Sequence, residues 1–253
     1  MQASGKANAQ RKIAIVGKAP SSRELAPYGD ESWTIWTLSD LVPRKQAKRF
    51  DAQFEFHPVD WFRQREMQGD DYLAWLRSIR GKPVYMAEPC AEIPESRPFP
   101  IQEVLQYFAP WRYFTNTVSY LIAFAIMQDP DAIGVWGVDM AQTQEYREQR
   151  PSCEWLLGWA QGKGIQVVLP PECDLMKTPF LYGYGHAGNT LRRKWEARNE
   201  ELATRIRNKS EKMRQHQQQY EQLQQEVIAL HGAKDAQNYY EQWTFDDGVN
   251  LGS

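Results

Sequence analysis

The stretch KIAIVGKAPSS, residues 12–22, decides the fold class of this chain. Its apolar, β-branched part does not alternate with polar residues, which is typical of a strand buried on both faces of a parallel sheet. Gly17 then permits a tight turn, and Ser21 or Ser22 can cap a following helix that has Glu24 in its first turn. Strand, glycine turn and capped helix form the first unit of a nucleotide-binding α/β fold, in which backbone N–H groups face a phosphate. An ordinary strand-to-helix turn fits the same residues, because the stretch matches neither GxGxxG nor the GxxxxGK[ST] phosphate loop.

Length and composition predict one sizeable core plus an appendage, since the chain has 253 residues of which 42% are hydrophobic. A net charge of −2 and a pI near 6.1 give no overall attraction to nucleic acid or to anionic membranes. There is no run of 18 apolar residues, and the polar N-terminus lacks the apolar core of a signal peptide. The three cysteines lack CxxC spacing and fit reduced thiols. We therefore expect a cytoplasmic protein that does not enter the membrane.

Strand-like and helix-like segments alternate between residues 12 and 185. After the first strand, β-branched and aromatic runs predict further strands at 33–38, 53–56, 83–86, 132–138 and 165–169. Helical patterns lie between them at 60–80, 101–108, 118–127 and 151–160. The segment Glu88–Pro100 carries four prolines and is expected to be a loop. This alternation predicts an α/β fold, a Rossmann-like parallel sheet with helices on both faces.

Residues 191–230 contain neither glycine nor proline and predict a long helix with a heptad pattern. Its a positions are Ile206, Met213, Tyr220 and Val227, and its d positions include Trp195, Leu202, Leu223 and Leu230. Polar residues in the middle of this seam, namely Lys209, His216 and Asn199, weaken it. A helix from Leu191 to Leu230 is on the order of 60 Å long, longer than the α/β body. We therefore expect it to self-associate as a coiled coil rather than to fold back over the body.

The expected organisation has four parts. They are a flexible arm at 1–11, a Rossmann-like nucleotide-binding domain at 12–185, a coiled-coil helix at 190–231 and a C-terminal tail at 232–253. In this interpretation Gly232 ends the helix, as glycine often does. Tyr239, Tyr240 and Trp243 of the tail are then expected to dock elsewhere on the protein.

Ligands of open parallel sheets bind beyond the carboxyl ends of the strands. This rule selects, in chain order, Gly17–Ser22, Thr37–Asp40, His57, Asn116 with Thr117, and Asp139. Each has a structural alternative, because Asp40 and Asp139 can cap turns and His57 can be a packed histidine bonded to backbone. The set as a whole favours a binding site, since a plain scaffold does not need a polar residue at every strand end.

Common catalytic signatures are absent from the sequence, which has no GxSxG, no HExxH and no kinase motif set. The four histidines are scattered and lack the ligand spacing of a zinc site, so no metal site is predicted. Glu145, Arg147 and Arg150 form a charged cluster behind the strand that ends at Asp139. Its arginines could pair bidentately with a phosphate or carboxylate, or the cluster could be a solvated loop.

Four blocks of the sequence resemble, in the same order, those of bacterial sialyltransferases and of related proteins that include the archaeal 6-hydroxymethylpterin diphosphokinases. Residues 17–21, GKAPS, resemble the family's nucleotide-contacting GxGPS turn. Residues 36–39, WTLS, resemble a second-strand end that holds an Asn, and residues 54–58, FEFHP, resemble a Phe-Phe-Asn-Pro block. Asn116-Thr117 with its apolar helix, followed by Ile133–Asp139, resembles a Thr-Ser-Gly helix and a Gly-Ile-Asp strand end. The resemblance covers about residues 12–176.

This resemblance implies a nucleotide site and glycosyl transfer from a nucleotide sugar. The candidate nucleotide-binding residues are Gly17, Lys18, Ser21, Ser22, Thr37, Ser39, Asn116, Thr117 and, from the charged cluster, Arg147. The sequence departs from the family at Lys18 and Ala19, which replace Asn and Gly, and at His57, which replaces Asn. The histidine proposed as the family's general base has no counterpart here, so His57, Asp139 and Glu145 are the candidates for acid–base catalysis.

The arrangement also resembles uncharacterised proteins of tailed phages, so a second hypothesis stands beside the transferase. In it the chain is a phage assembly or virion-associated structural protein that keeps a nucleotide-binding fold without catalysis. Phage structural proteins would then be partners, and the chain would lie in the host cytoplasm or the virion. The coiled coil favours this second hypothesis. Under the first hypothesis, the loop Glu88–Pro100 would exclude water from a bound nucleotide or nucleotide sugar.

Overall fold

The computed structural model describes residues 11–140, 145–178, 180–186 and 190–245, and the chain divides after Thr190 into two units. The first unit is built on a seven-stranded, fully parallel sheet with the order β5-β4-β3-β2-β1-β6-β7. Its strands are β1 Lys12–Val16, β2 Trp33–Leu38, β3 Ala52–Glu55, β4 Val84–Met86, β5 Ser96–Pro98, β6 Ala132–Trp136 and β7 Gln166–Val168. The predicted α/β fold with a parallel sheet is confirmed.

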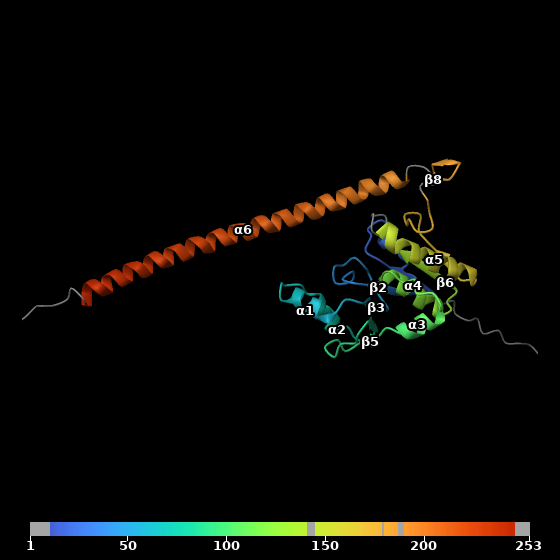
Figure 1. The fold of residues 1–253 in the computed structure, drawn as a ribbon, viewed down its shortest axis with the longest axis horizontal. Helices are drawn as coiled ribbons and strands as arrows, with labels where there is room; N and C mark the ends of the chain where they lie inside the picture. The colour runs from blue at the N-terminus through green and yellow to red at the C-terminus, as the bar shows by residue number, and fades with distance from the viewer. Residues whose placement is uncertain (1–10, 141–144, 179, 187–189, 246–253) are drawn as a thin grey trace, which may run out of the picture. The chain divides into compact units, whose positions relative to one another are not determined.

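Helices and turns connect these strands (Figure 1). The helices are α1 Val59–Glu66, α2 Tyr72–Ser78, α3 Ile101–Tyr107, α4 Thr117–Met127 and α5 Arg150–Gly162, and the hairpin β8 Phe180–Leu181 and β9 Gly185–His186 follows β7. α1 and α2 connect β3 to β4, α3 and α4 connect β5 to β6, and α5 connects β6 to β7. The helical pattern at 60–80 thus forms two helices, and Gly69, with φ of 82°, lies between them.

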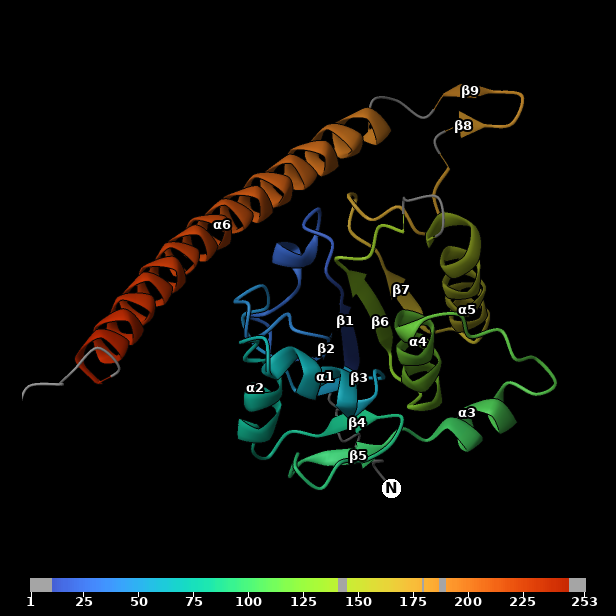
Figure 2. The same ribbon diagram turned by 60° about the vertical axis from the view of Figure 1, so that its left-hand side comes forward.

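Helices cover both faces of the sheet (Figure 2), and β3 shows why. Phe54 points to the face of α4, where its ring lies 6.3 Å from that of Phe124. Gln53 and Glu55 point to the opposite face, where both hydrogen-bond to the hydroxyl of Tyr72 on α2. Successive side chains of a strand alternate between faces, so one short strand contacts helices on both sides of the sheet.

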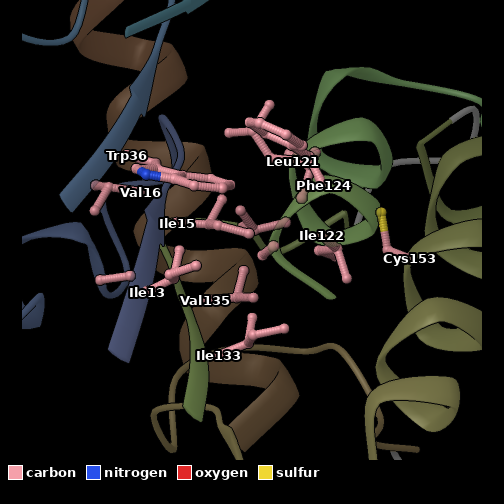
Figure 3. Packing of buried hydrophobic residues seen from close by; sticks show 14 of the residues in the cluster. Ile13, Ile15, Val16, Trp36, Leu121, Ile122, Phe124, Ile133, Val135 and Cys153 are labelled. Carbon is pink, nitrogen blue, oxygen red and sulfur yellow. The ribbon is translucent and has the colours of Figure 1, made fainter. Parts of the chain in front are cut away.

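The helix α4 lies at the centre of the core, and its burial confirms the prediction of an apolar helix packed on the sheet. Figure 3 shows Leu121 and Phe124 of α4 directed toward Trp36 of β2 and Ile15 of β1. The rings of Trp36 and Phe124 stack with their centroids 5.4 Å apart. Each such side chain contributes roughly 1.5–3 kcal/mol when it is fully buried, so this layer holds α4 firmly against the sheet.

The connection from β1 to β2, all of which is described, contains no α-helix, and this corrects the predicted strand–turn–helix unit. Only the 3-10 turn Arg23–Leu25 follows β1. Ser22 precedes this turn without capping it, because its hydroxyl accepts a hydrogen bond from the backbone N–H of Gly137 instead. A single 3-10 turn does not offer the aligned N–H groups of a full helix, so the phosphate site predicted at a helix N-terminus is not present here.

The segment predicted as a loop at Glu88–Pro100 contains the edge strand β5. Its Ile93 is buried in a cluster with side chains of α1 and α2. Glu92 of the same segment accepts hydrogen bonds from Arg63 and, at 2.5 Å, from Arg77. The segment is therefore fastened to α1 and α2 beyond β4, and this position does not support its expected role in excluding water from the ends of β1 and β2.

The second unit is one continuous helix, α6 Thr190–Phe245 (Figure 1). The prediction that Gly232 ends the helix is wrong, because one glycine costs a helix interior only about 1 kcal/mol. Tyr239, Tyr240 and Trp243 consequently lie on α6, where they are exposed. The coiled coil stays a prediction, and the side chain of its seam residue Trp195 lies outside the described residues. Among the described helices, α6 included, none combines the length and the apolar character needed to cross a membrane.

Candidate functional site

The turns after β1 and β6 pack against each other at the carboxyl edge of the sheet. The backbone N–H of Gly17 donates to the carbonyl of Trp136 at 2.8 Å. Ala19 donates to the carbonyl of Gly137 at the same distance, so the ladder continues past both strands. A Cβ on Gly17 would lie 2.5 Å from the oxygen of Gly137, and one on Gly137 would lie 2.4 Å from the oxygen of Gly17. Both glycines are therefore required for backbone packing, and Gly17 faces protein rather than an open crevice.

Two serine side chains reinforce the contact between these turns. Ser21 Oγ donates to Asp139 Oδ1 at 2.6 Å. Ser22 is fully buried, and its Oγ accepts from the N–H of Gly137 at 2.8 Å.

Open α/β sheets bind ligands where the strand order reverses, which is between β1 and β6 in this sheet. Because the two turns fill that position, we place the candidate site over the ends of β1, β2 and β3.

A group of charged and aromatic side chains lies over these three strand ends, and we call it the edge cluster. It consists of Lys18, Asp40, His57, Trp61 and Arg65. Lys18 Nζ lies 2.5 Å from Asp40 Oδ1, and Arg65 Nη2 lies 3.9 Å from the same carboxylate. Burial of Asp40 raises its pKa, but the hydrogen bond and the charge of Lys18 outweigh burial, so the net pKa is lowered. The ionised Asp40 thus joins the turns after β1 and β2 to α1.

His57 is the titratable side chain at the centre of the edge cluster. Its Nδ1 lies 2.5 Å from Oε1 of the buried Glu55, and its ring stacks on Trp61 with the centroids 4.7 Å apart. A carboxylate only accepts, so Nδ1 carries the proton, and Nε2 has no hydrogen-bond partner among the described residues. The hydrogen bond to Glu55 raises the pKa of His57, against the effects of burial and of the Lys18 and Arg65 charges. Because 53% of its side chain is exposed, this imidazole can exchange a proton with a bound molecule.

The contribution of His57 to folding is expected to depend on pH. Its folded pKa lies above the value of about 6.5 for an unfolded chain, so its stabilising effect is complete below that pH and is lost as the pH rises through the folded pKa. Urea unfolding of the wild type and of His57→Gln at about pH 6 and about pH 9 measures this effect. The difference in the free energy of unfolding between the two proteins should be larger at the lower pH. A difference that does not change with pH would contradict the pairing with Glu55.

Two residues at the end of β2, Thr37 and Ser39, have different surroundings. Thr37 is fully buried and donates to Gln53 Oε1 at 2.6 Å, so its hydroxyl cannot reach a nucleotide, which corrects its predicted role. Ser39 adopts a left-handed φ of 53°, and its carbonyl accepts from Gln53 Nε2 at 2.8 Å. Ser39 is partly exposed and is the residue of this pair that stays a candidate.

Asn116 is the N-cap of α4. Its Oδ1 accepts from the N–H of Ser119 at 2.9 Å, and Ser119 Oγ accepts from the N–H of Asn116 in return. The amide Nδ2 of Asn116 donates to the carbonyl of Gln149 at 3.1 Å. Asn116 thus uses its side chain to cap α4 and to bind the turn before α5, and its predicted nucleotide contact stays a prediction. Thr117, the next residue, is partly exposed at the first turn of α4.

Three further candidates, Asp139, Glu145 and Arg147, follow β6 in the sequence. Asp139 accepts the hydrogen bond from Ser21 and lies at the same carboxyl edge as His57. The side chain of Glu145 lies outside the described residues. Arg147 is exposed on the π-helical turn Glu145–Gln149, which leads into α5. Asp139 and Arg147 are not members of the edge cluster.

A cavity of about 420 Å³ lies at the start of α5 and is lined by Arg150, Pro151, Glu154, Met176, Lys177 and Thr178. Arg150 Nε donates to Glu154 at 2.8 Å, and its Nη2 donates to the carbonyl of Asp174 at 2.7 Å. Lys177 Nζ donates to the carbonyls of Pro170 and Pro171. Both cations of this cavity thus bind protein oxygens, and Arg150, for which the sequence leaves a phosphate, a carboxylate or solvent open, pairs with the carboxylate of Glu154.

Sequence reasoning missed Glu55, Trp61 and Tyr72. The available signal was the pattern Gln53-Phe54-Glu55, which places two polar side chains on one face of a strand in the middle of a buried sheet. Buried carboxyl groups need partners, so such a pattern indicates a polar network whose other members the sequence does not identify.

Among the described residues there is no group of three or more His, Cys, Asp or Glu side chains that could hold a metal ion.

No protein-family model and no curated protein matches this chain. Solved structures to which this chain is similar include sialyltransferases of Campylobacter jejuni. The sialyltransferase CstII in complex with cytidine-5'-monophosphate is 14% identical, with a TM-score of 0.41 over 63% of this chain and 79% of that chain. An α-2,3-sialyltransferase from Campylobacter jejuni in apo form is 12% identical, with a TM-score of 0.42 over 64% of this chain and 76% of that chain.

Proposed function

We propose that this chain is a nucleotide-sugar-dependent glycosyltransferase whose donor lies over the carboxyl ends of β1, β2 and β3. The observation that carries the proposal is the pairing of the half-exposed His57 with the buried Glu55 at this edge. Glycosyl transfer needs a group that takes a proton from an acceptor hydroxyl. An imidazole whose Nδ1–H is held by a carboxylate presents Nε2 for this task.

Lys18 and Ser39 are the nucleotide-binding candidates that the proposal uses directly. Half of the Lys18 side chain is exposed at the turn where the sequence resemblance expects phosphates, and an ammonium group pairs well with phosphate. Ser39 lies at the adjacent strand end. Four further members of the predicted set, Gly17, Ser22, Thr37 and Asn116, shape the edge through contacts within the protein. Three others, Ser21, Thr117 and Arg147, stay candidates for contacts with the donor or the acceptor.

A thermal-shift screen with nucleoside monophosphates, nucleoside diphosphates and nucleotide sugars tests the proposal. A ligand at 100 times its dissociation constant stabilises a protein by about 2.7 kcal/mol, which is roughly 5–10 °C in melting temperature for this chain length. We expect Lys18→Met to reduce this shift, because the variant lacks the cation at the phosphate turn. The matched control is Lys212→Met, which removes the same charge from an exposed position of α6 that is neither an a nor a d position.

Two results would contradict the proposal. One is a wild type that no nucleotide or nucleotide sugar stabilises. The other is an equal loss of ligand-induced stabilisation in Lys18→Met and Lys212→Met, since this would show that binding follows net charge instead of the edge cluster. The second sequence hypothesis, a phage assembly or virion protein without catalysis, gains no support from the residues at this edge.

A further inference from the structure

A continuous chain of hydrogen bonds lies beneath His57, between β2, β3 and α2. Thr37 donates to Gln53 Oε1 at 2.6 Å, and Gln53 Nε2 donates to the hydroxyl of Tyr72 at 3.1 Å. Tyr72 donates to Glu55 Oε2 at 2.8 Å, and Glu55 Oε1 accepts from both the ring Nδ1 and the backbone N–H of His57. The four inner side chains are at most 2% exposed, while His57 reaches solvent.

The direction of each hydrogen bond in this chain is determined by its neighbours. The carbonyl of Ser39 only accepts, so the amide nitrogen of Gln53 must face it, and this orientation also directs that nitrogen to Tyr72. The single hydroxyl hydrogen of Tyr72 is then left for Glu55. Both carboxylate oxygens of Glu55 are therefore satisfied, one by Tyr72 and one by His57.

A carboxylate in this position is costly unless all its partners are present. Burial, together with the charge of Glu55, raises the pKa of Tyr72 well above its ordinary value, so Tyr72 stays a hydrogen-bond donor at all physiological pH values. The ring of His57 is held a second time by the face of Trp61, over which the guanidinium of Arg65 lies at 4.6 Å. The imidazole is thus constrained at Nδ1 and across its face, and Nε2 is the ring atom that faces outward.

We propose that Glu55 and Tyr72 are positioning residues that hold His57 with Nδ1 protonated and Nε2 directed to the substrate, and that His57, rather than Asp139 or Glu145, is the catalytic proton acceptor. The catalytic part of this inference rests on the proposed function. In the reaction, Nε2 takes the proton of the acceptor hydroxyl while that oxygen forms its bond to the anomeric carbon. The bond from the anomeric carbon to the phosphate oxygen breaks, and its electron pair leaves with the nucleotide.

Nitrogen-15 NMR of the histidine rings tests the positioning without any substrate. The chain has four histidines, and the signals lost in His57→Gln identify those of His57. In the wild type we expect a neutral ring protonated at Nδ1 and a pKa above about 6.5. In Glu55→Gln the pKa should fall, because the negative charge beside Nδ1 is removed, and the ring should change toward protonation at Nε2. The matched control is Glu200→Gln on α6, which should leave the His57 signals unchanged.

A second variant keeps the test decisive if Glu55→Gln does not fold. Tyr72→Phe removes only the hydroxyl, so Glu55 loses one donor and its bond to His57 strengthens. We expect the Nδ1 tautomer to persist and the pKa of His57 to rise further. An unchanged tautomer and pKa in Glu55→Gln, or an unchanged pKa in Tyr72→Phe, would overturn the positioning.

The catalytic assignment has its own readout. Once a donor has been found by the thermal-shift screen, kcat/KM should decrease at pH values below the pKa of His57, because the protonated ring cannot accept a proton. This ratio reports the pKa of the free enzyme, which is the quantity that NMR measures. In Tyr72→Phe the acidic limb of the pH–rate profile should move along the pH axis by the same amount, and in the same direction, as the pKa of His57 measured by NMR. A profile that does not follow the NMR pKa would overturn His57 as the proton acceptor. NMR results as expected in a protein that binds no nucleotide would leave the positioning intact and refute the glycosyltransferase.

Discussion

Replacing Gly137 by alanine is expected to destabilise the protein by about 2–5 kcal/mol. Two physical effects add. Gly137 has a φ of 65°, where a residue with a Cβ is strained, and the added Cβ would lie 2.4 Å from the carbonyl oxygen of Gly17. The neighbour is backbone held in the ladder between β1 and β6, so it cannot move aside as a flexible side chain would. Urea unfolding monitored by tryptophan fluorescence measures the loss in the free energy of unfolding.

Three further glycine-to-alanine variants separate the two effects. Gly81 has a φ of 68° with no atom near the added Cβ, so Gly81→Ala tests backbone strain alone. Gly17 has no left-handed φ, but a Cβ added to it would lie 2.5 Å from the oxygen of Gly137. Gly17→Ala therefore tests the close approach alone. Gly158 lies in α5 with nothing near it, and Gly158→Ala should stabilise the protein by roughly 0.5–1 kcal/mol. Equal losses in Gly137→Ala and Gly81→Ala would show that the contact between the turns is not limiting.

These results bear on the interpretation of Gly17. The sequence predicts that a larger residue at Gly17 abolishes nucleotide binding while the protein stays folded. The structure predicts instead that the main effect is on folding, because the space beside Gly17 is taken by the turn after β6. A loss of ligand binding in a Gly17 variant is therefore informative only when its stability has been measured as well.

The second large effect concerns α6. We propose that it joins two or more copies of this chain, and we expect the wild type to have a mass at least twice 29.5 kDa by light scattering. The seam residues that the structure describes are all exposed, namely Leu202, Ile206, Met213, Tyr220, Leu223, Val227 and Leu230. Each would gain up to roughly 1.5–3 kcal/mol by burial, while an isolated polar helix persists poorly in water. A partner copy offers the same heptad spacing along its whole length.

Two charges placed in this seam should dissociate the assembly. Tyr220→Asp together with Val227→Asp puts a carboxylate at two successive a positions, and we expect a mass near 29.5 kDa and an unchanged α/β unit. The matched control, Gln218→Asp together with Gln225→Asp, adds the same charges with the same spacing on the opposite side of the helix. The control should keep the mass of the wild type. A wild type of 29.5 kDa would refute self-association.

Local patterns in the sequence were sufficient to predict most of the fold. The run from Ile13 to Val16 and the helix 118–127 were recognised because burial on all sides leaves uninterrupted apolar residues, and burial of this kind is readable within ten positions. The edge strand Ser96–Pro98 is not predicted, since Pro98 and the flanking Pro94 and Pro100 indicate a loop, although an edge strand tolerates a proline. The end of α6 was misplaced because one glycine at 232 does not outweigh the helical preference of its neighbours.

The sequence predicts a candidate site at this edge of the sheet, but it does not identify all the side chains that meet there. His57 was selected from the sequence by the rule that ligands bind beyond strand ends, and the structure places it there, half exposed. Glu55, whose Oε1 lies 2.5 Å from Nδ1 of His57, is not among the residues that this rule selects. A polar residue inside a strand is usually solvent-facing, and only its neighbours show otherwise. Thr37 was selected and is buried, since the same rule does not say to which face a side chain points.

The sequence by itself therefore determined most of the helices and strands and the carboxyl edge of the sheet at which polar residues gather. Only the tertiary structure decided which of them meet, because hydrogen bonds such as Ser21 to Asp139 join residues 118 positions apart. It also decided why a glycine is needed at position 17, since the space for a Cβ there is taken by the turn after β6. Periodicity reports how much of a segment is buried, whereas the identity of its partner depends on strand order, and strand order is a property of the whole sheet.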